Sequence, residues 1–282
     1  MRTKELSDFI GTEITGVTSG DLTDQRALDE VLDHVHRNDL VVVRDIELTP
    51  AQQVRLAARI GRPVPLRRQS HPDHQEIMVL SNEVRDGKPV GVARAGNFWH
   101  QDSSCTPAPE TYTLLHGVDV PSTTGHTLFA SAADVYDRLP SAWKDKVSGR
   151  TALHTAAKRL RIGPEHLGLS IAELRQRVSD DHPRVPHDLV CHDPHTGRRY
   201  LYGAPEFLDS VVGFSQSENE EFLALIDGLI QDPERVYTHR WRPRDLVLWK
   251  TATTYHSATD LAPGTLRRVH RVSIRAEALQ GR

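Results

Sequence analysis

Short runs of hydrophobic residues, separated by polar turns, predict many short strands and a few helices. Apolar positions recur at helical spacing after Thr23, which we take as the N-cap of the first helix. The run 40–43 is short and fully apolar, which is typical of a buried strand. Residues 49–52 combine a capping threonine, a first-turn proline and a capping-box glutamine, so they predict a second helix that ends near residue 60.

The rest of the chain repeats this mixture of elements. A helix is predicted over 131–139, and Ser217 with Glu220 forms a capping box before an amphipathic helix. Strands are predicted over 77–80, 236–240, 245–249 and 269–276. The pattern favours a mainly β fold with helical cover, in a single domain that spans residues 1–282.

The segment 155–195 differs from its surroundings. It is rich in charges and prolines and has little strand alternation, so we interpret it as an irregular, partly helical insertion. An insertion of this kind can exclude water from a site, and we therefore expect it to form a mobile lid.

Composition narrows the class of protein. The 282 residues carry a net charge of −3 with both signs interspersed, which does not favour nucleic-acid or membrane partners. The apolar runs are too short to span a bilayer, and the chain does not open with a signal-peptide pattern. Two cysteines exclude a disulfide scaffold and fit a cytoplasmic location. A homo-oligomer is left open.

Sixteen histidines direct attention to metal binding. His100 and Asp102 are two residues apart and would project from the same face of a strand. This spacing is common by chance, but His256, Arg267 and Arg271 follow downstream. Two histidines and a carboxylate suit non-haem Fe(II) that activates oxygen, and an arginine could bind the carboxylate of a 2-oxo acid co-substrate.

The two arginines of the last predicted strand also indicate the substrate. Arg267 and Arg271 are four residues apart, so they would point into the same cavity from one strand face. A 2-oxo acid would neutralise one of them, and an unpaired guanidinium in a cavity is costly. We therefore expect a small anionic substrate at Arg271.

Five ordered blocks resemble the Fe(II)/2-oxoglutarate dioxygenases of the taurine dioxygenase (TauD/TfdA) group, which includes aryloxyalkanoate dioxygenases. These blocks are 97–102, 125–131, 196–202, 239–249 and 267–274. The resemblance runs from about residue 30 to 276. It implies a double-stranded β-helix, or jelly roll, that uses Fe(II), 2-oxoglutarate and O2.

The resemblance also assigns roles by matching position. The implied iron ligands are His100, Asp102 and His256. Thr127 and Arg267 match the residues that bind the distal carboxylate of 2-oxoglutarate, and Arg271 matches an arginine that holds the acidic group of the substrate. Because the carboxylate Asp102 is kept, halogenation, which needs a small residue there, is disfavoured.

Asn97 and Tyr255, which lie beside motif residues, are further substrate-binding candidates. Tyr255 fits equally well a position behind the site, packed in the core. The chain departs from the group at Trp249-Lys250-Thr251, where a Trp-Asp-Asn run is usual. It also has Leu66, beside Arg67 and Arg68, near the position of a sulfonate-binding histidine, which makes taurine itself doubtful as a substrate.

The predicted reaction is hydroxylation of an unactivated C–H bond, with release of succinate and CO2 and with fragmentation of some products. Desaturation, cyclisation or multi-step oxidation in natural-product biosynthesis is an alternative outcome at the same centre. A catalytically inactive jelly-roll binding protein is a second alternative, which the complete set of ligand and arginine residues disfavours.

Overall fold

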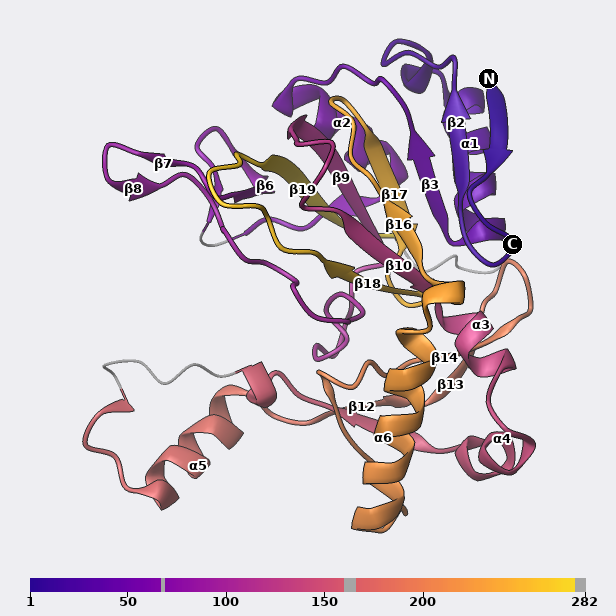
Figure 1. The fold of residues 1–282 in the computed structure, drawn as a ribbon, viewed down its shortest axis with the longest axis vertical. Coiled ribbons are helices and arrows are strands. Elements are labelled where there is room, and N and C mark those ends of the chain that lie inside the picture. Colours follow the sequence, from indigo (N-terminus) through magenta and orange to yellow (C-terminus); the bar gives the residue numbers. More distant parts are fainter. Residues whose placement is uncertain (67–68, 160–165, 277–282) are drawn as a thin grey trace.

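The computed structural model describes residues 1–66, 69–159 and 166–276. Within these ranges a nine-stranded, mostly antiparallel sheet forms one half of the molecule (Figure 1). Its strands, in spatial order, are β1 (Arg2–Glu5), β2 (Thr12–Thr15), β3 (Leu40–Val43), β17 (Leu246–Lys250), β9 (Tyr112–Asp119), β19 (Arg268–Arg275), β6 (His74–Ser81) and β5 (Ser70–His71), with β4 (Arg62–Pro63) beside β19.

A smaller sheet lies against this one and completes the jelly roll. It consists of β16 (Tyr237–His239), β10 (Thr127–Ser131) and β18 (Thr254–Ala258), with β10 in the centre. Large side chains from both sheets fill the space between them, among them Phe129, Trp241 and Trp249, all nearly inaccessible to solvent. The predicted mainly β, jelly-roll architecture is confirmed.

The outer face of the large sheet is covered by helices. Strand alternation places Val247 and Trp249 between the two sheets, whereas Leu246 and Leu248 face outwards. These outward side chains pack in one core with α1 (Gln25–Asn38) and α2 (Pro50–Ile60). Preceding α1 is the short 3-10 turn η1 (Asp21–Thr23). Strands β7 (Val84–Arg85) and β8 (Lys88–Pro89) form a separate β-hairpin.

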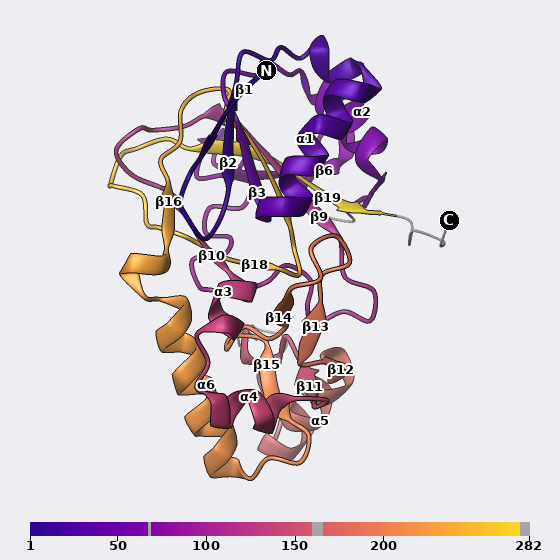
Figure 2. The same cartoon turned by 90° about the vertical axis from the view of Figure 1, so that its right-hand side faces the viewer.

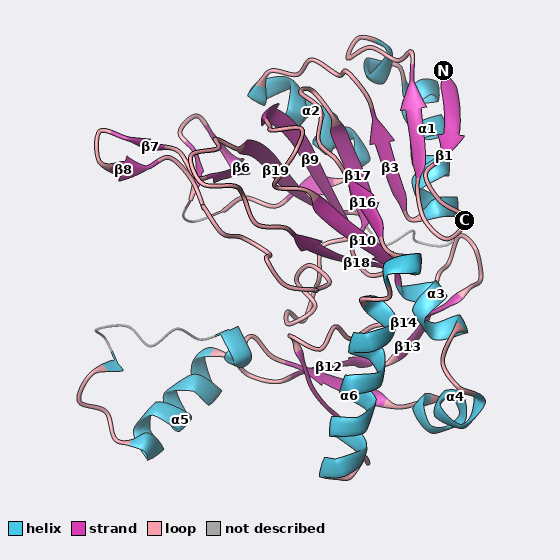
Figure 3. Ribbon diagram, in the orientation of Figure 1, coloured by secondary structure: helices cyan, strands magenta, loops and turns pink. Residues whose placement is uncertain are grey.

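The middle of the chain folds into a second lobe, beneath the jelly roll in Figure 2. Figure 3 shows that this lobe carries most of the remaining helices. Its elements are α3 (Ala132–Asp137), α4 (Ser141–Val147), β11 (Thr151–His154), η2 (Ala157–Arg159), α5 (Ile171–Asp181), β12 (Val185–Asp188), β13 (Val190–His192), β14 (Arg199–Leu201), β15 (Leu208–Val211), α6 (Gln216–Ile230) and η4 (Pro233–Arg235). Strands β12, β11 and β15 form one sheet, and β13 pairs with β14.

Two of the three predicted helix caps are placed differently in the structure. The capping box of Thr49 and Gln52 forms as expected. The first helix, however, is capped by Asp24, because Thr23 belongs to the 3-10 turn before it. Helix α6 begins two residues earlier than predicted, with Ser215 and Glu218 as its capping box, since this pair has the same spacing as the predicted one.

The predicted lid segment 155–195 is not uniform. Its last part is ordered: β12 and β13 lie in sheets, and Leu189 and Asp193 are buried. Helix α5 opens with a capping box of Ser170 and Glu173 and buries none of its residues. Residues 160–165 lie outside the described residues. A lid function therefore stays a prediction.

None of the helices in the described ranges is both long and apolar enough to cross a bilayer.

Candidate metal and cofactor site

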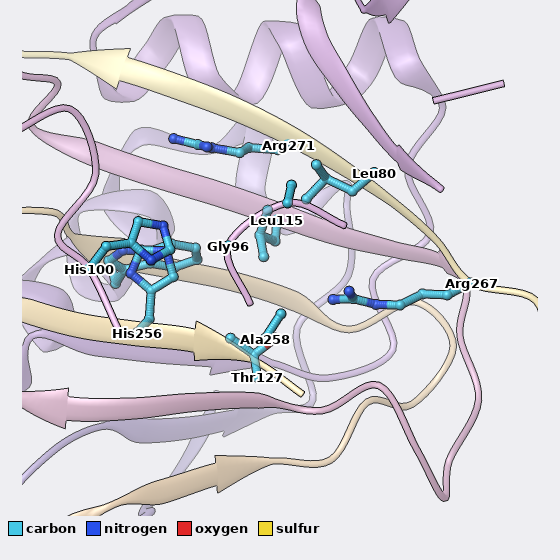
Figure 4. Close-up of a pocket in the computed structure, with 11 residues that line it drawn as sticks. Leu80, Gly96, His100, Leu115, Thr127, His256, Ala258, Arg267 and Arg271 are labelled. Atoms are coloured by element: carbon cyan, nitrogen blue, oxygen red, sulfur yellow. The ribbon is translucent and has the colours of Figure 1, made fainter. Parts of the chain in front are cut away.

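The two histidines of the predicted triad are joined through their backbones. His100 and His256 form an antiparallel bridge at the edge of the smaller sheet, with N–H···O distances of 3.0 and 2.9 Å. Asp102 lies two residues beyond His100, in a turn rather than on the predicted strand. One ligand atom from each of the three side chains lies within 4.8 Å of the others, and Figure 4 shows the two imidazoles side by side in the pocket.

The side chains of the triad are oriented for a shared ion. His100 Nε2 is 3.6 Å from Asp102 Oδ1, and His256 Nε2 is 3.7 Å from Asp102 Oδ2. The other ring nitrogen of His100, Nδ1, is 2.8 Å from the carbonyl oxygen of Phe98, which fixes the imidazole so that Nε2 faces the carboxylate. All three residues are buried. This donor set and its arrangement fit a facial triad for Fe(II).

The protonation states also fit metal binding. Burial of Asp102 opposes ionisation, but Arg271 and the two histidines hold the pKa of its carboxyl well below the usual value. Burial, together with the neighbouring His100, lowers the pKa of His256 to about 3. A carboxylate and a neutral imidazole are the forms that bind a metal ion.

Two side chains from the large sheet hold the carboxylate of Asp102. Thr113 on β9 donates its hydroxyl to Oδ2 at 2.7 Å, and Nη2 of Arg271 on β19 forms an ion pair with Oδ1 at 2.9 Å. The two contacts orient the carboxylate. Arg271 therefore has a protein anion, so the expectation that only a substrate would neutralise it is wrong. Sequence reasoning missed Thr113, because nothing local distinguishes it from other strand threonines.

Arg267 lies at the other end of the same pocket (Figure 4). Its guanidinium has no carboxylate within salt-bridge distance among the described residues, and its Nε has no hydrogen-bond partner there. Burial lowers the pKa of Arg267 to about 10. A guanidinium that is desolvated and lacks a protein anion is a natural receptor for an external carboxylate.

Thr127 lines this end of the pocket as predicted. Its Oγ1 accepts a hydrogen bond of 3.1 Å from Trp241 Nε1, and the Trp241 ring lies 5.9 Å from the Arg267 guanidinium. Because the oxygen already accepts from an indole, the hydroxyl hydrogen is directed elsewhere and can be donated to an anion. Thr127 and Arg267 thus bring a hydroxyl and a guanidinium to the same pocket.

Between these two ends the pocket is mostly apolar, and one glycine adjoins a ligand. The apolar lining is Leu80, Ala95, Leu115, Trp249 and Ala258. Gly96 has a φ of +75°, and a Cβ there would approach His100 Cε1 to 2.8 Å. A larger residue at position 96 would displace the His100 imidazole, which sequence reasoning did not anticipate.

The two remaining candidates lie outside this pocket lining. Tyr255 is fully buried and donates its hydroxyl to the carbonyl oxygen of Leu201 at 3.0 Å. The predicted substrate contact of Tyr255 is therefore wrong, and the alternative, packing behind the site, is the observed one. Asn97 is exposed, contacts Asp260 and lines a neighbouring cavity that shares Arg267 with the main pocket.

The structure also shows where the residues that depart from the family motif lie. Lys250 is buried and faces away from the pocket, where its ammonium contacts Asp39 at 3.0 Å and Asp193 at 2.5 Å. Its role is thus structural, in joining the two lobes. Leu66 is described, but Arg67 and Arg68 lie outside the described residues, so their part in substrate binding stays a prediction.

Comparison with known families decides the class. Residues 2–273 match the model of the taurine catabolism dioxygenase TauD, TfdA family. The chain belongs to this TauD/TfdA family. It is accordingly an Fe(II)- and 2-oxoglutarate-dependent oxidoreductase that uses O2, as the resemblance of its motifs implied.

Individual relatives of this TauD/TfdA-family chain differ in reaction. It is 30% identical to the pentalenolactone F synthase of Streptomyces arenae, over 93% of this chain and 91% of that protein. It is 24% identical to the alkylsulfatase of Acinetobacter baylyi, over 100% of this chain and 87% of that protein.

Solved structures agree with the fold. A taurine dioxygenase from Burkholderia xenovorans superposes with a TM-score of 0.76 at 27% identity, covering 98% of this chain and 89% of that one. AAD-2, in complex with Mn(II) and N-oxalylglycine, superposes with a TM-score of 0.80 at 23% identity, covering 98% of each chain.

Proposed function

We propose that this TauD/TfdA-family dioxygenase oxidises an unactivated C–H bond of a small anionic substrate. The observation that carries the proposal is the pairing of a His-Asp-His cluster with a buried arginine that has no carboxylate partner among the described residues, in one pocket. A metal triad alone would fit several metal ions. A carboxylate receptor beside it adds the second requirement of 2-oxoglutarate chemistry.

The residues then divide into two groups. His100, Asp102 and His256 would hold Fe(II) through two neutral imidazoles and one carboxylate. Arg267 and Thr127 would bind the distal carboxylate of 2-oxoglutarate, the guanidinium by a charge-assisted pair and the hydroxyl by a single hydrogen bond.

The bound iron and 2-oxoglutarate supply an oxidant: O2 is consumed, 2-oxoglutarate is converted to succinate and CO2, and one oxygen atom goes to the substrate. The protein contributes an apolar wall to the pocket. Leu80, Leu115 and Ala258 line the space between the imidazoles and Arg267, so the reacting C–H bond would meet no competing polar group on these side chains.

Arg271 would contact the anionic group of the substrate. Its Nη2 is occupied by Asp102 and by Ser273 Oγ at 3.2 Å, but its Nε has no hydrogen-bond partner among the described residues. A substrate carboxylate, sulfonate, phosphonate or sulfate could bind the N–H groups of Arg271 that Asp102 and Ser273 do not use. Because Asp102 already supplies one negative charge, we expect the substrate anion to add specificity rather than to be required for folding.

Two steps test this function. Anaerobic addition of Fe(II) and then 2-oxoglutarate should produce the weak visible charge-transfer band of the chelate. Small carboxylates, sulfonates, phosphonates and sulfate esters are then screened for succinate release above the uncoupled rate, each beside its neutral ester or amide. Equal stimulation by anionic and neutral members of each pair would contradict the anionic substrate but not the dioxygenase.

A second outcome at the same centre is favoured by one relative. The similarity to pentalenolactone F synthase, a protein named for a biosynthetic product, supports multi-step oxidation or ring formation as the alternative. Mass spectrometry of the product separates the two: hydroxylation adds one oxygen atom, whereas desaturation or cyclisation removes two hydrogen atoms.

A further inference from the structure

Two residues that adjoin the metal-binding candidates contact the same backbone carbonyl. Gln101 lies between His100 and Asp102, and Tyr255 directly precedes His256. On an extended chain, neighbouring side chains point to opposite faces, so these two point away from the pocket. Both reach the same stretch of the second lobe, at the end of β14.

The contacts use every polar group of the two side chains. Gln101 Nε2 donates to the carbonyl oxygen of Leu201 at 3.2 Å and also to that of Ala252, while its Oε1 accepts from the backbone N–H of Gly203 at 2.9 Å. The Tyr255 hydroxyl donates to the same Leu201 oxygen at 3.0 Å. Gln101 and Tyr255 have no exposed surface, so water cannot replace these bonds.

The stretch that they hold is itself fixed. Leu201 is fully buried, and β14 pairs with β13 through Cys191 and Val190. The hairpin that these strands form is attached to the jelly roll at its far end, where Asp193 contacts Lys250 at 2.5 Å. The carbonyl of Leu201 is thus a rigid point of reference for the segments that carry the ligands.

We propose that Gln101 and Tyr255 are positioning residues that set the spacing of the three metal ligands by fixing both ligand segments to the backbone at Leu201–Gly203. Leaving a buried carbonyl or N–H without its partner is costly, so neither segment can shift alone without breaking these bonds. The inference rests on the proposed metal site, and it makes the second lobe part of the metal-binding framework.

The test compares two conservative pairs of variants. Tyr255→Phe removes only the hydroxyl, and its control, Tyr112→Phe, removes a buried hydroxyl that lies 2.8 Å from His36 Nε2 on α1. Gln101→Met removes the amide at similar length, and its control, Gln53→Met, removes a fully buried amide that donates to the carbonyl of His270 at 3.1 Å. Each variant is assayed as the full chain for Co(II) and Mn(II) affinity, the absorption spectrum of bound Co(II), and Tm.

We expect Tyr255→Phe to weaken Co(II) and Mn(II) binding by about 5-fold and Gln101→Met by about 10-fold, at or just below the lower end of the range of about 10–100-fold for groups that bond a metal ligand directly. Both should change the Co(II) spectrum, which reports ligand geometry. The two controls should stay within about twofold of the unaltered chain even where their Tm falls equally.

Metal affinities and spectra that match the controls would overturn the positioning role. Should Gln101→Met fail to fold, Tyr255→Phe against Tyr112→Phe decides the question alone. If the unaltered chain itself binds neither ion, the metal site fails and this inference fails with it, a result distinct from failure of the positioning role.

Discussion

The two ends of the pocket contain the same kind of side chain in opposite situations. Arg271 and Arg267 lie four residues apart near the start of β19, and both reach the pocket (Figure 4). Arg271 meets the carboxylate of Asp102 at 2.9 Å. Arg267 meets no carboxylate among the described residues, and burial lowers its pKa to about 10.

This difference suggests different roles: Arg271 orients Asp102, whereas Arg267 is available to bind an external carboxylate. At the Arg271 end the charges of the protein already balance, so a ligand there is optional for the free energy of folding. At the Arg267 end a desolvated cation has no protein carboxylate within salt-bridge distance among the described residues, so we expect a bound carboxylate to neutralise it. From the sequence, the two arginines are equivalent, since both are expected on the same strand face. Only the partners that they contact in the structure distinguish their roles.

The largest effect is expected at the metal end itself. His256→Ala removes one of two imidazoles, so Fe(II) binding and the charge-transfer band with 2-oxoglutarate should be lost. Asp102→Gly should likewise abolish product formation. His34→Ala, on α1 and away from the pocket, is the control and should bind Fe(II) normally. Near-normal Fe(II) affinity in His256→Ala would show that the triad is assigned incorrectly.

The next largest effect is expected at the Arg267 end of the pocket. Removing one partner of a buried charge pair commonly costs about 3–5 kcal/mol, so Arg267→Ala should weaken 2-oxoglutarate binding by roughly 100-fold or more. Fe(II) binding should stay intact, which distinguishes this end from the other. Titration of the charge-transfer band measures both constants. A change below about fivefold, roughly 1 kcal/mol, would mean that another cation binds the carboxylate.

A smaller effect is expected for the outer partner of Asp102. Thr113→Val keeps the shape of the side chain but removes its hydroxyl, which leaves Asp102 Oδ2 without its donor. We expect Fe(II) affinity to fall about tenfold, with 2-oxoglutarate affinity changed mainly through the metal. Calorimetry with Mn(II) measures this, and Thr113→Ser, which retains a hydroxyl, should recover most of the affinity. No loss in Thr113→Val would make Arg271 the sole support.

The most selective change concerns Arg271. Arg271→Lys keeps the positive charge near Asp102 but loses the additional guanidinium N–H groups, which the substrate anion would use. We expect the substrate KM for succinate release to rise about fivefold while the 2-oxoglutarate affinity stays nearly constant. If Fe(II) affinity falls more than substrate affinity does, Arg271 serves Asp102 rather than the substrate.

The sequence predicted the parts of the site that lie in short motifs. His100 and Asp102 are two residues apart, and Arg267 and Arg271 are four apart, so the alternation of an extended chain was enough to predict that each pair lies together. In the structure Asp102 lies in a turn and Arg267 just precedes β19. His256 lies far along the chain, and its assignment came from the ordered blocks of the family. The strand 40–43 was likewise predictable, because a short apolar run has few alternatives in a sheet-rich fold.

The rest depends on contacts between distant segments. Thr113 on β9 contacts Asp102 in a turn 11 residues earlier, and Gln101 contacts residues 100 and 151 positions away. Strand periodicity shows which face a side chain occupies but not which backbone it meets. The same limit explains Tyr255, whose face was ambiguous beside a ligand, and the cap of α6, where two serine–glutamate pairs had identical spacing.

The buried ammonium of Lys250 also governs how far this enzyme can be recombined with its relatives. It joins Asp39, at the end of α1, to Asp193, in the turn between β13 and β14. A chimera that imports only the β13–β14 hairpin from a homologue without this aspartate would leave part of a buried charge uncompensated, at a cost of about 3–5 kcal/mol. A chimera should therefore exchange position 250 and the β13–β14 hairpin together.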